Sequence, residues 1–337
     1  MNNITCGRER WGRRETSGEG RWFPPRRVQI YAHRANRGLW PEHSLPAYAA
    51  ALKMGCDYVD MDVNLTRDGV LVVTHDQVLN PDLTRNAAGA WITASPPLHT
   101  LSYAEVRRYN VGKIKPGTDY ARLFPQQQAL DFAAIPTLRE VVRCVKGLAG
   151  DRVGFQIEIK HDPRRPQLSA GPREYAERLY TLLREEELVA QVEVQAFAWV
   201  CLLELRKLAP AVKTMFLTAS AVEIPEALEA GVRTAGSRPK DFVGSLPGMI
   251  KSLKGYGWGP WQVDLTRESL DEAHRLGLKV VPWGWPEKEG CDFNREVVAR
   301  LIDWGVDGLV TDRADLLREM LAARGYDIPS GIVSPSG

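Results

Sequence analysis

The chain has 337 residues, of which 44% are hydrophobic and 26% charged, and its formal net charge is only +2. This composition is typical of a globular protein with a large core. So small a net charge gives no reason to expect a nucleic acid or an anionic membrane surface as a general partner. The length suits one large domain such as an α/β barrel, or two ordinary domains.

The five cysteines lie far apart and form no CxxC pair. A disulfide framework or a zinc ribbon is therefore not expected, and buried thiols in a reducing compartment are the simpler interpretation. The sequence contains neither an apolar run of about 18 residues nor the shorter apolar run of a secretory signal. We predict a cytoplasmic protein without stable membrane insertion, and the sequence leaves its oligomeric state open.

Composition also sets the predicted domain limits. Residues 1–27 are rich in Arg, Gly and Pro and are predicted to form a flexible basic tail. One domain is predicted over 28–325, followed by a tail over 326–337 that looks loose from Pro329 onward.

Eight β-rich apolar runs alternate with helical patterns, which is typical of βα units around a parallel sheet. The predicted strands are 28–32, 58–63, 154–160, 192–197, 213–217, 261–265, 279–283 and 308–311. Eight parallel strands close a (β/α)8 TIM barrel, which is the predicted fold class.

The first predicted helix has clear ends. Ser44 is a good N-cap, apolar residues follow at helical spacing, and Gly55 stands where the helix should stop. Two later helices, predicted over 268–276 and 295–304, also end in glycine.

One connection reads as a hairpin instead of a helix. Asp68 and Gly69 between two β-rich runs are a strong signal for a two-residue turn. With that turn, Asp62 pairs with His75, and their Cβ atoms would lie about 4.5–5.5 Å apart. The hairpin would thus return His75 to the carboxylates of the preceding strand.

The stretch from about 79 to 135 breaks the βα rhythm, because it carries several prolines and one helical piece near 102–109. Connections of this length are usually lids or binding loops. We predict an inserted subdomain over the barrel mouth.

Carboxylates stand where a buried strand would normally place Val or Ile. Asp60 and Asp62 share one face of a strand, and Gln156, Glu158 and Lys160 share one face of another. Like charges so close need a cation, and a set of hard oxygen ligands suits Mg²⁺ or Ca²⁺ better than Zn²⁺. The alternative is that these carboxylates lie at exposed strand ends, each with its own hydrogen bonds.

Two histidines flank this cluster, in His33-Arg34 at the end of the first strand and in His75-Asp76 at the end of the hairpin. Histidine titrates near neutrality and serves as a general acid or base, and an arginine fork suits phosphate oxygens. A cation, a phosphate clamp and two proton carriers are the parts needed to displace an alcohol from a phosphodiester. The other histidines, His43, His99, His161 and His274, are interpreted as structural or surface residues.

Taken together, these motifs resemble the glycerophosphodiester phosphodiesterase family over roughly 28–321. The N-terminal part of the resemblance is Ala-His-Arg at 32–34, Pro-Glu-His-Ser-Leu-Pro-Ala at 41–47, the run 60–69 and Val-Val-Thr-His-Asp at 72–76. Further on, the residues at 158–160, 195–197, 283 and 305–312 follow in the order of the family's motifs.

The resemblance implies a TIM barrel with a helical insertion after the hairpin, and hydrolysis of glycerophosphodiesters to glycerol 3-phosphate and an alcohol. It implies that His33 and His75 take the acid and base roles. The other implied roles are metal binding by Glu42, Asp60, Asp62 and Glu158, phosphate binding by Arg34 and Lys160, and substrate binding by Gln195 and Trp283.

The sequence departs from the family pattern at several positions. The family usually has Glu where this chain has Asp60, which is one methylene shorter. It often has Gly where this chain has Ala35, so we expect the backbone there to avoid positive φ. The loop Trp-Gly-Trp-Pro at 283–286 also differs, and it bears on substrate choice.

The predicted mechanism is in-line attack at phosphorus, with either water or a glycerol hydroxyl of the substrate as the nucleophile. Trp258, Trp261, Trp283 and Trp285 form either an aromatic wall for the substrate or simple packing at the barrel rim. Two rival functions stay open: a phospholipase D-like enzyme on the same barrel that acts on intact lipid, and a barrel that binds phosphodiesters without turning them over.

Overall fold

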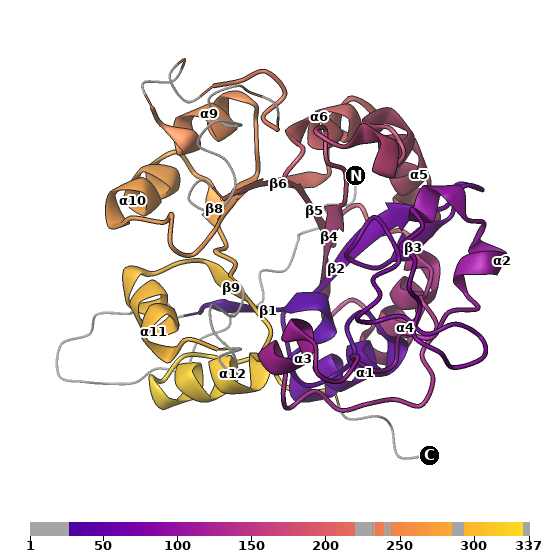
Figure 1. Cartoon of the computed structure of the whole chain (residues 1–337). Coiled ribbons are helices and arrows are strands. Elements are labelled where there is room, and N and C mark those ends of the chain that lie inside the picture. Colours follow the sequence, from indigo (N-terminus) through magenta and orange to yellow (C-terminus); the bar gives the residue numbers. More distant parts are fainter. Residues whose placement is uncertain are drawn as a thin grey trace, which may run out of the picture.

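The computed structural model describes residues 27–219, 231, 233–238, 241, 244–284 and 293–332. Eight parallel strands form a ring with the helices around it, so the predicted TIM barrel is confirmed (Figure 1). In sheet order the strands are β8 (Lys279–Val280), β7 (Gly257–Pro260), β6 (Lys213–Thr218), β5 (Val192–Ala196), β4 (Gly154–Ile159), β2 (Tyr58–Leu65), β1 (Gln29–Ala32) and β9 (Gly308–Thr311).

Backbone hydrogen bonds close the ring between the two ends of this order. The amide of Asp307 donates to the carbonyl of Val280 at 3.0 Å. The amide of Val310 donates to the carbonyl of Pro282 at 3.1 Å. Closure leaves no exposed strand edge in the barrel.

Eight described helices surround the barrel. They are α1 (Leu45–Met54), α4 (Leu138–Ala149), α5 (Pro172–Glu185), α6 (Trp199–Leu208), α9 (Leu246–Ser252), α10 (Arg267–Arg275), α11 (Arg295–Trp304) and α12 (Ala314–Ala323). Of these eight, α1, α4, α9, α10 and α11 have a side-chain N-cap. The predicted N-cap of α1 is confirmed, since Ser44 Oγ accepts from the amide of Ala47 at 3.3 Å, and Gly55 ends that helix. Gly305 ends α11 in the left-handed conformation.

One predicted strand is wrong. The strand expected over 261–265 lies just upstream as β7, which has two glycines and a terminal proline, residues that are uncommon inside strands. Those glycines are required by the register, because a Cβ on Gly257 would come within 2.4 Å of Met215 Sδ and one on Gly259 within 2.6 Å of Leu217 Cδ2. Large side chains from β6 thus fill the interior where β7 has none.

The hairpin exists, but its register is one residue off the prediction. β2 pairs antiparallel with β3 (Leu71–Val73), and Val63 lies opposite Val73. The turn therefore holds three residues, with Gly69 at φ +74°, and the backbone partner of Asp62 is Thr74 instead of His75. A three-residue loop with glycine in the left-handed position is a common hairpin connection.

The residues between β3 and α4 form the insertion, with the short helices α2 (Tyr103–Val106) and α3 (Asp119–Leu123). The insertion packs on the hairpin through a small apolar cluster made by Val72, Leu79, Leu98, Val106 and Ile135. It is therefore anchored to the barrel next to the strand ends.

The predicted flexible N-terminal tail lies, except for Arg27, outside the described residues. The C-terminal tail differs from the prediction up to Ile332, whose amide donates to the carbonyl of Leu52 at 3.0 Å and whose side chain is buried. Within the part of the chain that the structure describes, no helix has the length and apolar character needed to cross a bilayer.

Candidate active site

The polar side chains gather at the carboxyl ends of the strands, where (β/α)8 barrels carry their active sites. Asp60 and Asp62 lie on β2, and Asp62 is the register partner of Glu158 on β4. His33 follows β1 directly. Residues from three neighbouring strands are thus brought together, as the alternation of side chains predicted.

Two cations lie among the carboxylates. Arg34 Nη1 is 3.3 Å from Glu42 Oε1, and Arg34 Nε is 3.3 Å from Asp62 Oδ2. Lys160 Nζ is 2.7 Å from Glu158 Oε1 and 3.7 Å from Asp62 Oδ1. Asp62 is therefore the centre of the cluster and contacts both cations.

Asp60 has different partners. Its Oδ1 accepts from Gln195 Nε2 at 2.9 Å, and its Oδ2 accepts from the backbone amide of Arg34 at 3.1 Å. The predicted substrate ligand Gln195 thus directs its amide group at Asp60.

Each of the two predicted catalytic histidines is oriented by a carboxylate. His33 Nδ1 lies 2.6 Å from Asp312 Oδ1, and His75 Nδ1 lies 2.7 Å from Asp76 Oδ1. Asn80 Nδ2 donates to the other oxygen of Asp76 at 2.7 Å. With Nδ1 engaged in this way, Nε2 is the nitrogen of each imidazole that is left for chemistry.

Both imidazoles are neutral at neutral pH. Burial, opposed by Asp312 and aided by Arg37 and then Arg34, lowers the pKa of His33 to about 4. Burial and the charges of Arg34 and Lys160 lower the pKa of His75 to about 4. Arg34 follows His33 directly in the chain and lines one cavity together with His75.

If all four were ionised, the carboxylates would carry more negative charge than the two cations offset. Burial, together with the charge of Asp62, raises the pKa of Glu158 to about 7 and that of Asp60 well above its usual range. Burial would also raise the pKa of Asp62, but Lys160 holds it well below its usual range. Four carboxylates, including Glu42, face two cations, so the ionised cluster is short of two positive charges.

That charge balance bears on the predicted metal. Among the described residues, no three histidine, cysteine or carboxylate side chains are close enough to enclose an ion as they stand. Arg34 and Lys160 lie among the carboxylates there. The carboxylate oxygens nevertheless fit Mg²⁺ or Ca²⁺, because they are hard ligands. The two positive charges that the ionised cluster lacks are also the charge of one divalent cation.

His43 is a site residue that the sequence did not reveal. Its Nε2 lies 2.9 Å from Asp62 Oδ2 and its Nδ1 lies 3.1 Å from Tyr48 Oη, and the ring is buried. The interpretation of His43 as merely structural missed this contact, because His43 lies 19 residues from Asp62 in the chain.

Two cavities flank His75 and Asp76, which line both of them. The barrel cavity, of about 190 Å³, is also lined by Glu158, Lys160, Phe197, Arg233 and Trp283. The insertion cavity, of about 290 Å³, is also lined by Arg34, Arg37, Glu42, Leu83, Tyr120 and Leu123. His75 and Asp76 thus lie between two separate spaces.

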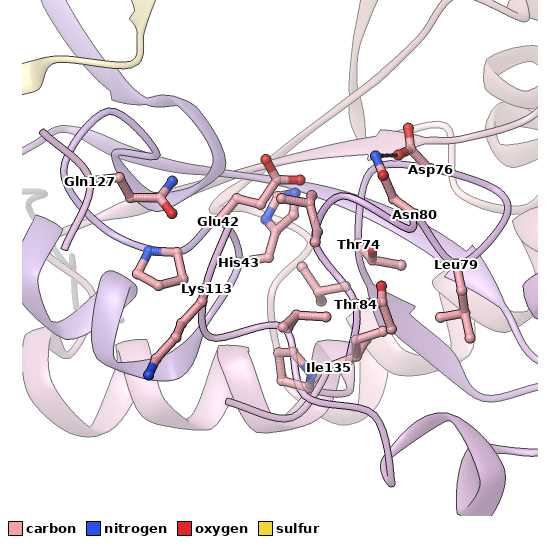
Figure 2. Close-up of a pocket in the computed structure, with 15 residues that line it drawn as sticks. Glu42, His43, Thr74, Asp76, Leu79, Asn80, Thr84, Lys113, Gln127 and Ile135 are labelled. Atoms are coloured by element: carbon pink, nitrogen blue, oxygen red, sulfur yellow. Dashed lines mark hydrogen bonds between the residues drawn. The ribbon is translucent and has the colours of Figure 1, made fainter. Parts of the chain in front are cut away.

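A third, small cavity of about 20 Å³ lies beneath the insertion (Figure 2). Glu42 and His43 lie on one side of it, and the hydrogen-bonded pair Asp76 and Asn80 lies on another. Its volume is about that of one water molecule. The insertion therefore packs tightly behind the site.

Comparison with known proteins identifies the family. Residues 33–316 match the model of the glycerophosphoryl diester phosphodiesterase family. The chain belongs to this family. Its predicted enzyme class, a phosphoric diester hydrolase, is confirmed with the family.

Relatives match over nearly the whole chain. A glycerophosphodiester phosphodiesterase of Bacillus subtilis is 27% identical over 92% of this chain and 91% of its own length. A solved structure from Silicibacter pomeroyi, described as belonging to the glycerophosphoryl diester phosphodiesterases, is 31% identical, with a TM-score of 0.79 over 90% of this chain and 96% of its own. A phosphodiesterase of Oleispira antarctica, solved with sn-glycerol-3-phosphate, shares the fold with a TM-score of 0.62 at 18% identity, over 87% of this chain and 96% of its own.

The backbone at Ala35, one of the departures from the family pattern, differs from the expectation. Ala35 adopts φ +61°, although its methyl group was expected to exclude positive φ, and its neighbours Arg34 and Asn36 are left-handed too. The hydrogen bonds of this turn hold it in place, with the amide of Asn36 donating to the carbonyl of His33 at 2.8 Å and Asn36 Oδ1 accepting from Ala314 at 2.8 Å. Such conformations persist where the surroundings over-determine them.

Of the four tryptophans that were expected either to form an aromatic wall for the substrate or to pack at the barrel rim, some do each. Trp258 is buried, and its Nε1 donates to Thr218 at 2.9 Å, while Trp261 packs in an apolar cluster at the rim. Trp283 lines the barrel cavity and meets Phe197 edge to face at 5.3 Å. Trp285 lies outside the described residues.

Proposed function

We propose that this member of the family hydrolyses glycerophosphodiesters to glycerol 3-phosphate and an alcohol, with His33 and His75 as the general acid and base. The observation that carries the proposal is the pair of imidazoles, each fixed by a carboxylate at Nδ1, with Arg34 next to His33 in the chain and lining the insertion cavity together with His75. A protein that only binds phosphodiesters needs no such pair of proton carriers.

The reaction needs one imidazole to accept a proton and the other to donate one. Neutral imidazoles are ready to act as bases, and a bound phosphodiester anion would raise the pKa of the ring beside the leaving alcohol, so that this ring becomes the acid. Arg34 and Lys160 would hold the phosphate oxygens and offset charge in the transition state.

The proposal includes one divalent cation, Mg²⁺ or Ca²⁺, held by Glu42, Asp62 and Glu158. Asp60 would contribute only through lone pairs that Gln195 and the Arg34 amide leave available. When bound, the cation would polarise the phosphate and lower the pKa of the attacking hydroxyl. The two missing positive charges of the cluster support it.

The test is release of glycerol 3-phosphate from a panel of glycerophosphodiesters, with and without chelator. We expect release that EDTA abolishes and that Mg²⁺ or Ca²⁺ restores. No release from any diester would contradict the proposed reaction, whereas full activity after exhaustive chelation would contradict the metal alone. Cyclic phosphate released from intact lysophospholipid would favour the phospholipase D-like alternative.

A further inference from the structure

The insertion cavity has a wall of mixed character. It is lined by Arg34, Arg37 and Glu42 from the barrel and by Leu83 and Leu123 from the insertion. Both leucines are half-buried and face the cavity without being covered. Half-exposed apolar side chains around a cavity beside a reaction centre are typical of a ligand subsite.

Every charged group in this wall already has a partner. Arg34 pairs with Glu42 and Asp62. Arg37 is held by Asp312, to which its Nε donates at 2.7 Å.

The carboxylates of the wall are paired in the same way. Glu42 also accepts from the Tyr120 hydroxyl, and Asp76 bonds to His75 and Asn80. In the proposed function the divalent cation meets the charge deficit of the carboxylate cluster. A charged ligand group that entered the cavity would then lose its water without gaining an unpaired counter-charge, and such desolvation is unfavourable.

Resting on the proposed function, we propose that the insertion cavity binds the alcohol half of the diester and selects an uncharged alcohol with an apolar body. The glycerol half then occupies the barrel cavity, where Lys160 offers a hydrogen-bond donor and Phe197 and Trp283 offer aromatic faces. His75 lies where the two cavities meet, which puts the phosphorus between them.

The test uses two diesters of nearly equal shape, glycerophospho-n-propanol and glycerophosphoethanolamine, which differ by a methyl group in place of an ammonium. The kcat/KM for glycerol 3-phosphate release should be about tenfold or more higher for the propyl ester, because its methyl group is buried without loss of ion hydration. Equal values, or a preference for ethanolamine, would overturn the proposal.

Leu123→Glu places a carboxylate in the lining of the cavity and should lower the propyl-to-ethanolamine ratio of kcat/KM by about tenfold. Leu83→Glu should have the same effect. Phe132→Glu is the matched control, since Phe132 belongs to the insertion but is 63% exposed and does not line the cavity. Its ratio should equal that of the wild type. If a variant yields less folded protein, both rates fall by the same factor, so the ratio of the two kcat/KM values measured on one preparation is unchanged.

The outcomes separate this inference from the proposed function. If neither ester releases glycerol 3-phosphate, the proposed function fails. If both release it and the ratio is unaffected by either leucine substitution, the assignment of the insertion cavity fails while the function stands.

Discussion

At the scale of single residues, the site depends on carboxylates that fix imidazoles. Asp312 is the most connected of them, because it accepts from His33 and from two nitrogens of Arg37, at 2.7 and 3.2 Å. Its side chain is 1% exposed. It therefore both orients the imidazole of His33 and neutralises the buried guanidinium of Arg37.

The first prediction at this scale concerns the two histidines. His33→Ala and His75→Ala should each lower kcat by about 10²–10⁴-fold, the usual contribution of a general acid or base. The measurement is steady-state glycerol 3-phosphate release. His274→Ala is the control, because His274 lies on α10 and bonds to Asp307 at 3.1 Å. Near-wild-type kcat in either catalytic variant would refute the acid–base assignment.

The second prediction at this scale concerns the stability that Asp312 provides. Burial would raise its pKa, but Arg37 and His33 hold it far below the ordinary value. The folded state therefore binds fewer protons than the unfolded state at low pH. The stabilisation is fully present above the unfolded pKa and is lost as the pH falls through the folded one.

Asp312→Asn leaves the Arg37 guanidinium buried without its anion and should reduce the free energy of unfolding at neutral pH by about 3–5 kcal/mol. In urea titrations the difference from wild type should stay constant from about pH 8 to 5 and shrink below about pH 4. His33 titrates in both proteins, so its loss of stability between its ordinary pKa and about 4 largely cancels. A difference that grows toward acid pH would contradict this account.

At the scale of elements, the insertion contributes directly to the site. Tyr120 on α3 donates to Glu42 and lies 3.3 Å from Arg37 Nη1. Arg37 also stacks on Phe124, at 4.7 Å from the ring. Helix α3 is thus attached to the same groups that hold His33 and the carboxylate cluster.

Tyr120→Phe removes a hydrogen bond to a buried carboxylate and should lower kcat/KM by about tenfold, since bonds to charged groups are worth about 1.5–3 kcal/mol. Tyr103→Phe is the matched control, because the Tyr103 hydroxyl donates to Glu140 at 3.0 Å at an exposed position of the same insertion. Equal kinetics for the two variants would show that α3 does not support the site.

At the scale of the whole molecule, a second polar layer ties the barrel together nearer the strand starts. Glu193 on β5 accepts from Lys279 on β8 at 2.7 Å and from Tyr31 on β1 at 3.0 Å. Its side chain is fully buried. Gln195, two residues further along β5, contacts Asp60 in the catalytic layer. The interior is thus built in layers, as in other (β/α)8 barrels.

Glu193→Gln should lower the free energy of unfolding by about 3–5 kcal/mol, because Lys279 is left as an uncompensated, nearly buried charge. Asp271→Asn, which breaks the exposed pair with Arg267, should change it by less than about 1 kcal/mol. Both are measured by urea denaturation, and kcat should be unchanged in both. A loss in Glu193→Gln no larger than in Asp271→Asn would show that the inner layer does not hold the barrel together.

Local sequence determined the strand-and-helix alternation, the caps of α1 and α11, and the candidate groups at the strand ends. Those features depend on residue type and on periods of two and 3.6 residues, which can be read along the chain. Even Asp312 stands directly after β9, where the barrel rule points to catalytic residues.

Tertiary structure decided the rest. The glycines of β7 make sense only beside Met215 and Leu217, and the left-handed Ala35 only within its hydrogen-bonded turn. His43 and Tyr120 reach Asp62 and Glu42 across 19 and 78 residues of chain. Contacts between distant segments depend on how the whole barrel closes, and no local pattern encodes that closure.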